Sequence, residues 1–172
     1  MGGQLPAADV ADLVLGLAVL RYTQSNSACY LHDGMTLGIC AGQQSRIDCT
    51  RLAGAKVDTW WLQRHSVVRG RAFQPGIRGH DRINWQTRLI EGDPTPDEST
   101  RLSDALSAPA PPLTARQRAE WRVDLDQVAF VSDGALPFRD HVHRHGVRYI
   151  AEPGGSIRST DVADACREHR IM

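Results

Sequence analysis

Apolar residues near the amino terminus recur with helical spacing and then alternate as they do in strands. Residues 8–22 are apolar at almost every position of the helix they predict, so we expect this helix to be buried between layers. Two short apolar runs follow at 28–31 and 36–40, and the Asp-Gly pair at 33–34 indicates a tight hairpin turn between two strands. The polar segment after them opens a longer helix, which we expect over about 43–64.

The second half of the chain begins with a segment of different character. Residues 67–112 are rich in Gly, Pro, Asp and Ser, which indicates a long surface insertion with one short helix. Beyond it, Thr114 and Gln117 have the spacing of a capping box at the start of a helix. The chain then alternates: a strand at "QVAFVSDG", a helix from Pro137, a strand at "VRYIAEP" and a helix over 160–169, after which the last two residues resemble the start of a further strand.

This order of elements predicts an α/β fold, a three-layer sandwich around a central mixed sheet. The 172 residues suffice for one domain with a real core and are too few for two comfortable ones. We therefore expect a single domain over 1–172 that carries the insertion at about 67–112 on its surface.

Composition excludes some classes of function. The formal net charge is zero, so the chain has no electrostatic footprint for nucleic acid. The positive charge is almost all arginine, with Lys56 the one lysine, and arginine favours planar contacts to phosphate or carboxylate. The apolar run at the amino terminus lacks a basic leader and is too short to span a bilayer, so we expect no membrane segment.

The cysteines indicate a reducing compartment. Four of them stand at wide spacings without a CxxC pair or zinc-finger spacing: Cys29, Cys40, Cys49 and Cys166. Three of them lie in predicted strands or helices beside Ala, Ile or Thr, so we interpret the cysteines as buried free thiols of a cytoplasmic protein.

Polar residues gather where predicted strands meet helices, which is where binding chemistry is usually placed. Asn26 is a carboxamide that could donate to a developing oxyanion, or simply cap a helix end. Arg46 lies in the first turn of its helix, where it could bind an anion or be a solvated surface arginine. Asp140 could accept two N–H donors from a heterocycle or only stabilise a helix dipole, and the glycines of 152–156 could form a backbone nest.

The histidines near 141–145 do not make a convincing metal site. On a helix His141 and His145 share a face whereas His143 does not, and no acidic residue completes an HExxH pattern, so a solvated helix is the favoured interpretation. The sequence has no PCxxC segment to combine with an H/C-x-E segment, as the site of zinc deaminases requires. The sequence also has no nucleophile elbow, P-loop or dinucleotide fingerprint.

Taken together, these polar segments carry a resemblance. They resemble the carboxy-terminal half of the aminoimidazole-carboxamide ribonucleotide (AICAR) transformylase domain of the bifunctional purine-biosynthesis enzyme, in its eukaryotic-type form. The matching text is "RYTQSNSACY", "AGQQSRIDCTRLAGAKVDTWWLQRH", "SDGALPFRD" and "YIAEPGGS". The likeness covers most of residues 8–170, and it implies a cytidine deaminase-like fold without zinc, of which this chain is the second subdomain.

The resemblance also implies a reaction and a set of site residues. Members of that family transfer a formyl group from 10-formyltetrahydrofolate, a co-substrate, to the amine of AICAR, and the transfer requires no metal. By resemblance, Asn26 acts in catalysis by positioning the formyl oxygen and the substrate amine, and Arg46 binds an anionic or carboxamide group of the substrate. The residues that the resemblance assigns to the folate site are Ile47, Pro137, Phe138, Asp140 and Ser156.

Departures from the family pattern leave more than one function open. The family's Lys-His pair, the acid and base of transfer, has no counterpart here, and the cyclohydrolase domain is missing. Ala135 and Leu136 replace an aromatic pair, so a stacking wall is expected to be missing. One hypothesis is a partial active site, completed by a homodimer or by a complementing amino-terminal half. The alternatives are a non-catalytic folate- or nucleotide-binding or dimerisation remnant, and a deaminase-type zinc site built from Cys29, Cys40 and the histidines.

Overall fold

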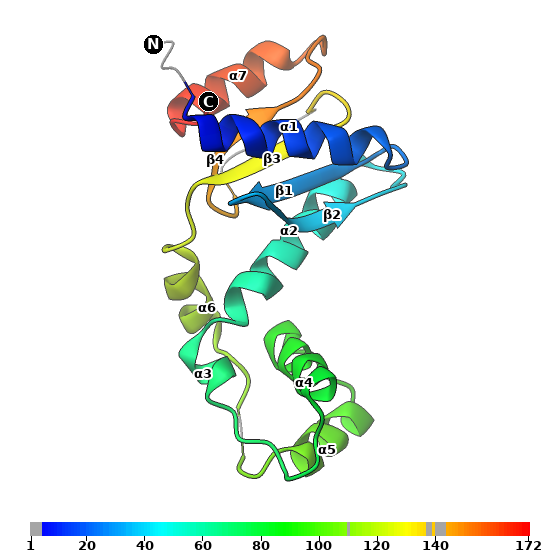
Figure 1. Ribbon diagram of the computed structural model, residues 1–172, viewed down its shortest axis with the longest axis vertical. Helices are drawn as coiled ribbons and strands as arrows, with labels where there is room; N and C mark the ends of the chain where they lie inside the picture. The colour runs from blue at the N-terminus through cyan, green and yellow to red at the C-terminus, as the bar shows by residue number, and fades with distance from the viewer. Residues whose placement is uncertain (1–4, 110, 137–138, 140–143) are drawn as a thin grey trace. The chain divides into compact units, whose positions relative to one another are not determined.

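The computed structural model describes residues 5–109, 111–136, 139 and 144–172. The chain divides into two compact units, the second of which is Thr59–Val123 and the first of which is formed by the residues on either side of it. The elements of the first unit are α1 (Ala7–Arg21), β1 (Ala28–His32), β2 (Met35–Cys40), the larger part of α2 (Arg46–Leu62), β3 (Val128–Ser132), β4 (Val147–Ala151) and α7 (Ser159–Glu168), which Figure 1 labels. Among the helices of these described segments, none is long and apolar enough to cross a membrane.

The first unit is built on a mixed sheet with the strand order β2-β1-β3-β4. β1 runs antiparallel to both β2 and β3, while β3 and β4 run parallel. The hairpin between β1 and β2 forms as predicted: Asp33 and Gly34 have φ angles of 50° and 73°, so both central turn residues are left-handed. Asp12 of α1 accepts a hydrogen bond of 2.7 Å from the Gly34 N–H, which ties the turn to the helix.

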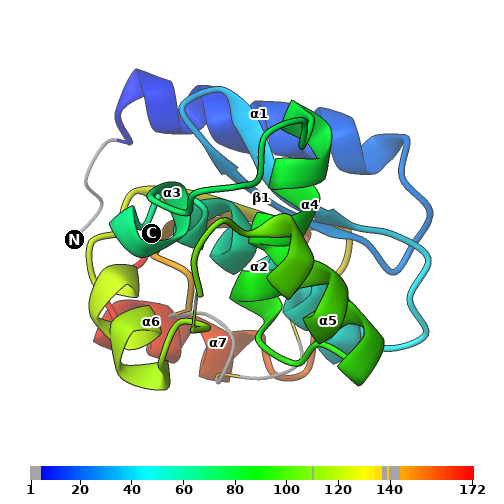
Figure 2. The ribbon, with the colours of Figure 1, turned by 90° about the horizontal axis from the view of Figure 1, so that it is seen from below.

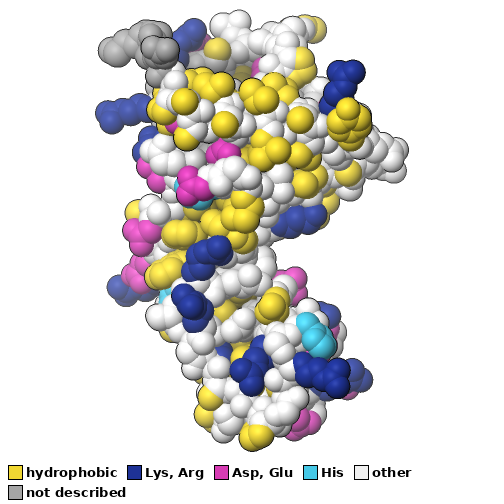
Figure 3. Space-filling model, in the orientation of Figure 1, with side chains coloured by type: hydrophobic (Ala, Val, Ile, Leu, Met, Phe, Trp, Pro, Cys, Tyr) yellow, Lys and Arg dark blue, Asp and Glu magenta, His cyan; other side chains and the backbone are white. Residues whose placement is uncertain are grey.

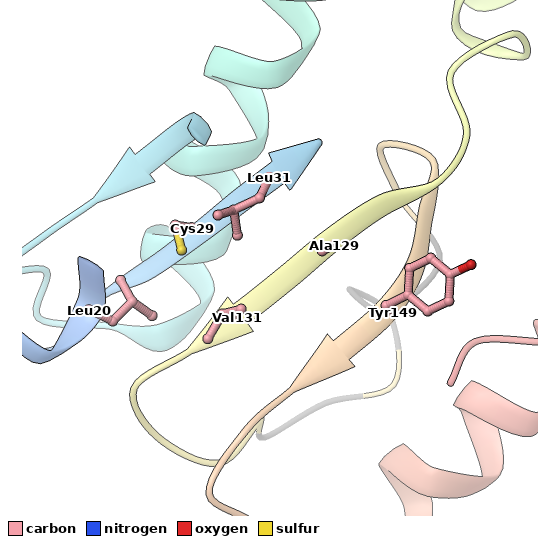
Figure 4. Packing of buried hydrophobic residues seen from close by; sticks show 6 residues of the cluster. All are labelled: Leu20, Cys29, Leu31, Ala129, Val131 and Tyr149. Atoms are coloured by element: carbon pink, nitrogen blue, oxygen red, sulfur yellow. The ribbon is translucent and has the colours of Figure 1, made fainter. Parts of the chain in front are cut away.

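α1 covers one face of this sheet. Its Leu20 packs with side chains of β1, β3 and β4, namely Cys29, Leu31, Ala129, Val131 and Tyr149, and Figure 4 shows this cluster. Contact is close because Gly16 faces the strands: a Cβ at Gly16 would lie 2.5 Å from Val131 Cγ2. A glycine is therefore required at the centre of the helix, in spite of its low helix propensity.

α2 covers the opposite face. Its residues Cys49, Ala53 and Val57 are fully buried at four-residue spacing. On the same face Tyr30 of β1 packs against Phe130 of β3 in a tilted arrangement, with ring centroids 4.6 Å apart. Figure 2 shows α1 and α2 on opposite sides of β1, so this unit has helix, sheet and helix layers. The α/β class and the mixed sheet are confirmed, whereas the cytidine deaminase-like assignment stays a prediction.

The expectation that α1 is buried between two layers is wrong. Only Asp12, Gly16 and Leu20 of this helix are buried, and its opposite side exposes Val10, Val14 and Leu17. A helix that is apolar all round is typical of a buried one, but here the sheet covers a single side.

The second unit is more regular than predicted for 67–112. Its elements are α3 (Ser66–Arg69), α4 (Gly79–Glu91), α5 (Pro96–Ala105) and α6 (Ala115–Arg122), so one short helix was too few. α5 and α6 both begin with complete capping boxes, and the predicted pair of Thr114 and Gln117 forms one of them. The unit has apolar clusters of its own, including Leu62, Val68, Ile90 and Leu113 in one and Leu89, Leu102 and Leu106 in the other.

The last residue pairs beside β4. The Met172 N–H donates to the Arg148 carbonyl at 2.9 Å, and the Met172 carbonyl accepts from the Ile150 N–H at 2.7 Å. One residue bonded to both neighbours of Tyr149 is the pattern of a parallel ladder. The end of the chain therefore has the strand-like pairing that its sequence suggests.

The close approach at Gly16 gives a first prediction. We expect Gly16→Ala to lower the free energy of unfolding by about 1–2 kcal/mol, because overpacking costs about 1–3 kcal/mol and outweighs the gain of about 1 kcal/mol in helix propensity. Urea unfolding followed by circular dichroism measures the change. Gly79→Ala is the matched control, since nothing lies within 4 Å of the added methyl group. An unchanged or raised stability of Gly16→Ala would contradict this packing.

Candidate functional site

The sheet register gathers the polar segments at one edge. Ala28, the first residue of β1, pairs with Ser132, the last residue of β3, and Val131 of β3 pairs with Ala151 of β4. The start of β1 and the ends of β3 and β4 therefore lie at the same edge of the sheet. The segments containing Asn26, Asp133 and Glu152 all adjoin it, as expected for ligand sites of α/β sheets.

Asn26 and Arg46 are brought into direct contact. Arg46 Nη2 donates a hydrogen bond of 2.8 Å to Asn26 Oδ1. Arg46 is the first residue of α2, and Asn26 lies in the segment between α1 and β1. Two residues that the sequence separates by a whole hairpin thus form one polar unit.

The orientation of the Asn26 carboxamide is fixed by its neighbours. Asn26 Nδ2 donates to the Gln43 carbonyl at 2.8 Å, and the two residues also exchange backbone hydrogen bonds of 3.4 and 3.3 Å. Arginine only donates and a backbone carbonyl only accepts, so Oδ1 must face Arg46 and Nδ2 must face Gln43. One N–H of Nδ2 and one lone pair of Oδ1 remain beyond these two bonds.

Arg46 is held by more than Asn26. Its Nη1 donates to the Ser27 carbonyl at 3.0 Å and to Ser132 Oγ at 3.3 Å, and it forms a short ion pair with Asp133. The side chains of Arg46 and Asp133 are only 14% and 16% exposed. Gly134 leaves space for the guanidinium, because a Cβ there would lie 2.5 Å from Nη2.

Asp133 stays ionised in this setting. Burial alone opposes its charge, but the Ser25 hydroxyl, the Arg46 guanidinium and the Ser27 N–H at 3.0 Å together hold its pKa below the ordinary value. The Asp133 N–H also donates to the Ser27 carbonyl at 3.2 Å. This carboxylate therefore joins the end of β3 to the start of β1 and to α2.

The residues predicted to bind folate are only partly visible. Ile47 follows Arg46 in the first turn of α2 and is half-buried. Ser156 precedes α7, where its N–H donates to Ser159 Oγ at 3.0 Å and its hydroxyl accepts from the Arg158 N–H at 3.1 Å. Pro137, Phe138 and Asp140 lie outside the described residues, as does most of the predicted helix from Pro137, so the structure does not test their convergence with Asn26.

Sequence reasoning missed the importance of Asp133 and Gln43. Both were visible as polar residues next to predicted strand or helix ends, but nothing in the sequence identifies their partners. One signal could have pointed to Asp133: it is an acidic residue directly after a predicted buried strand. If Arg46 is buried, it needs such a counter-ion.

A metal site finds no support in the described segments. They contain no group of three or more His, Cys, Asp or Glu side chains that could hold an ion. His145 Nδ1 lies 2.9 Å from Asp58 Oδ1, and its ring packs against Gly54 of α2, so the structure accounts for it as a packing residue. Burial raises the pKa of Cys29 to about 12, which disfavours the thiolate that a metal would require. His141 and His143 lie outside the described residues.

Two surface hollows occur in the second unit. One of about 630 Å³ is polar and includes Asp81, Arg88 and Glu98, and the other, of about 550 Å³, includes Leu102, Leu106 and Pro112. Of the predicted site residues that the structure describes, neither Asn26 and Arg46 nor Ile47 and Ser156 line these two hollows. The polar network at the sheet edge is therefore the candidate functional site.

Comparison with known proteins identifies relatives of this region. A family model described as "AICARFT/IMPCHase bienzyme" matches residues 3–56, a segment that includes α1, Asn26 and Arg46. The "Bifunctional purine biosynthesis protein PurH" of Aquifex aeolicus (strain VF5) is 24% identical over 168 residues. That match covers 96% of this chain and 21% of the relative, so the chain spans about a fifth of the length of the curated relative it matches.

The ion pair predicts a large effect of removing its acid. Asp133→Ala leaves the Arg46 guanidinium largely buried without its counter-ion, and we expect the free energy of unfolding to fall by about 2–3 kcal/mol. Chemical denaturation of the intact chain measures this loss. Asp164→Ala is the control, because Asp164 pairs with Arg167 on the exposed surface of α7, and it should cost less than about 0.5 kcal/mol. Equal losses in both variants would show that burial of the pair does not matter.

The lowered pKa of Asp133 predicts a pH dependence. A carboxyl whose folded pKa lies below its unfolded value stabilises the protein above the unfolded pKa, and this contribution is lost as the pH falls through the folded pKa. We therefore expect the stability difference between the wild type and Asp133→Asn to be constant from about pH 7 to 5 and to shrink below about pH 4. Unfolding of both proteins across this range tests the sign, and a difference that grows on acidification contradicts it.

Proposed function

We propose that this chain serves formyl transfer in purine biosynthesis as part of an AICAR transformylase domain. The support is the match of residues 3–56 to the AICARFT/IMPCHase bienzyme model and the similarity of most of the chain to a bifunctional purine biosynthesis protein. The proposed donor is 10-formyltetrahydrofolate and the proposed acceptor is the amine of AICAR. The proposed chemistry takes place in the cytoplasm, where free cysteines such as those of this chain remain thiols.

The proposed reaction is an acyl transfer without a metal. The amine nitrogen of AICAR attacks the formyl carbon, a new C–N bond forms, and the bond from that carbon to N10 of the folate breaks. The amine loses a proton and N10 gains one, so tetrahydrofolate leaves. The formyl oxygen carries negative charge in between and needs a hydrogen-bond donor.

The single observation that carries the proposal is the fixed carboxamide of Asn26. With Oδ1 held by Arg46 at 2.8 Å and Nδ2 held by Gln43 at 2.8 Å, the remaining N–H of Nδ2 has a defined direction before any substrate binds. A preorganised donor stabilises an oxyanion without paying for reorientation during the reaction. In the proposal this N–H donates to the formyl oxygen.

Arg46 has a more limited role in this proposal than the resemblance implies. Its Nη atoms already donate to Asn26, Ser27, Ser132 and Asp133. A contact with a substrate anion or carboxamide would require Arg46 to share these donors. We propose that Arg46 chiefly positions Asn26, and that the folate is held by Ile47, Pro137, Phe138, Asp140 and Ser156.

The proposed site is incomplete within this chain. No Lys-His pair stands in the matching sequence, so the proton transfers need groups from elsewhere. The proposal therefore includes a complementing part, either a separate amino-terminal half or a second copy that completes the site.

A second candidate function is a non-catalytic folate- or nucleotide-binding remnant. One observation favours it: the charges of Arg46 and Asp133 satisfy each other inside the chain, so the network stabilises the fold without any ligand. The two candidates agree on binding and differ on turnover.

Reconstitution separates the two candidates. The chain is mixed with AICAR, 10-formyltetrahydrofolate and a separately expressed amino-terminal half of a transformylase domain, and tetrahydrofolate release is followed by absorbance. We expect turnover above either part alone, and Asn26→Asp, which removes the Nδ2 donor, should lower kcat by about 100- to 1000-fold. Asn84→Ala, a change on the exposed surface of α4, should leave kcat unchanged.

Binding is measured in the same samples. If a folate analogue binds, as heat released on titration shows, but no turnover occurs, the result supports the non-catalytic remnant. If the chain shows no binding and no turnover, both candidates are refuted. The melting temperature of Asn26→Asp must lie within a few degrees of the wild-type value. Only then does a lower kcat report the loss of the Nδ2 donor rather than a loss of fold.

A further inference from the structure

The Arg46 guanidinium occupies space that is free because position 134 has no side chain. Apart from chain neighbours, the three heavy atoms nearest to a Cβ built on Gly134 are Nη2, Cζ and Nε of Arg46, at 2.5, 3.3 and 3.9 Å. Heavy atoms that are not bonded to each other pack at about 3.5–4.0 Å, so Nη2 would have to retreat by about 1 Å. All three contacts are to one guanidinium, so the conflict is specific to Arg46.

The backbone at Gly134 does not itself require a glycine. Its φ angle lies outside the left-handed region, which is where glycine has its conformational advantage. The backbone is also held in place, because Ser132 Oγ donates to the Gly134 carbonyl at 2.7 Å. The preceding N–H, that of Asp133, donates to the Ser27 carbonyl at 3.2 Å. A side chain at position 134 would therefore move the end of the flexible arginine rather than the loop.

The guanidinium cannot yield at one nitrogen alone. It is planar and rigid, so a displaced Nη2 takes Nη1 with it. Nη2 donates the 2.8 Å hydrogen bond to Asn26 Oδ1, while Nη1 donates to the Ser27 carbonyl and forms the ion pair with Asp133. Hydrogen bonds from nitrogen to oxygen are about 2.7–3.2 Å long, so a shift of about 1 Å would weaken or break the bonds of both nitrogens.

We propose that Gly134 is a positioning residue: the absence of a side chain lets the Arg46 guanidinium lie between Asp133 and Asn26, and this fixes the direction of the free Asn26 N–H. Gly134 contacts no substrate in this scheme and acts through Arg46. The placement of Arg46 by Gly134 follows from the geometry alone, whereas its effect on catalysis rests on the proposed formyl transfer.

The pKa of Asp133 reports the position of the guanidinium. Burial alone would raise this pKa, and hydrogen bonds from Ser25, Arg46 and the Ser27 N–H bring it below the ordinary value. In Gly134→Ala the guanidinium retreats, so we expect the pKa of Asp133 to rise. Carbon-13 NMR of the side-chain carboxyl groups of the intact chain, followed as the pH is lowered, measures the change.

Two references make this measurement specific. The hydrogen bond from Arg148 lowers the pKa of Asp126, which should be the same in Gly134→Ala as in the wild type. Val14→Ala is a control in the first unit, because Val14 is 58% exposed on α1, over which Figure 3 shows hydrophobic side chains. It should leave the pKa of Asp133 unchanged. If Gly134→Ala also leaves the pKa of Asp133 unchanged, the proposal is overturned.

Removing the guanidinium tests whether Gly134 acts through Arg46. The Met side chain of Arg46→Met has no atoms beyond the place of Nε, so it leaves room for a methyl group at position 134. We expect Gly134→Ala to lower the melting temperature by about 2–4 °C in the wild type and by less than about 1 °C in Arg46→Met. Gly79→Ala, whose methyl group meets nothing within 4 Å, should have the same effect in both backgrounds. Equal losses for Gly134→Ala in the two backgrounds would overturn the proposal.

Turnover of the reconstituted mixture tests the catalytic consequence. A misplacement of about 1 Å can cost about 100-fold in rate, so Gly134→Ala should lower kcat by about 10- to 100-fold. The KM of both substrates should stay within about threefold, because Arg46 acts on them through Asn26. An unchanged kcat with a raised KM would overturn the positioning role and assign Arg46 to substrate binding. If the wild-type mixture shows no turnover, formyl transfer is refuted, while the pKa and unfolding results still decide whether Gly134 positions Arg46.

Discussion

The ion pair between Arg46 and Asp133 is the constraint on which the site depends. It joins the start of α2 to the end of β3 and, through the Ser27 carbonyl, to the start of β1. Bringing two charges out of water is costly, and the pair tolerates this because each partner has further hydrogen bonds. Three segments that are distant in sequence are thereby held within one hydrogen-bonded network.

This network fixes the orientation of the Asn26 carboxamide. Alone, a carboxamide in a loop samples many orientations and is a poor catalyst. Held between an obligate donor and an obligate acceptor, it offers one N–H in a fixed direction. A rigid donor of this kind is what stabilisation of a developing oxyanion requires. The same bonds also strengthen the fold, so the structural role of the network and the catalytic role that we propose for Asn26 do not exclude each other.

Local sequence was sufficient for the elements that local chemistry determines. The Asp33-Gly34 turn formed because both positions need positive φ, and the helix at Thr114 formed because its capping box is complete within four residues. The outward face of α1 and the partner of Arg46 could not be predicted in this way, because both depend on contacts between remote segments. Composition alone gave a wrong prediction for 67–112. The Gly and Pro residues there lie at the ends of helices, and the capping residues and apolar faces of these helices were overlooked.

The coupling between Arg46 and Asp133 tests the central claim most directly. A double-mutant cycle compares the wild type with Arg46→Met, Asp133→Asn and the double variant, and unfolding of these four proteins gives the interaction energy. The account predicts a coupling of at least about 2 kcal/mol, because each single change strands a largely buried charge or dipole. Additive effects, with a coupling below about 0.5 kcal/mol, would mean that the pair does not organise this edge of the sheet.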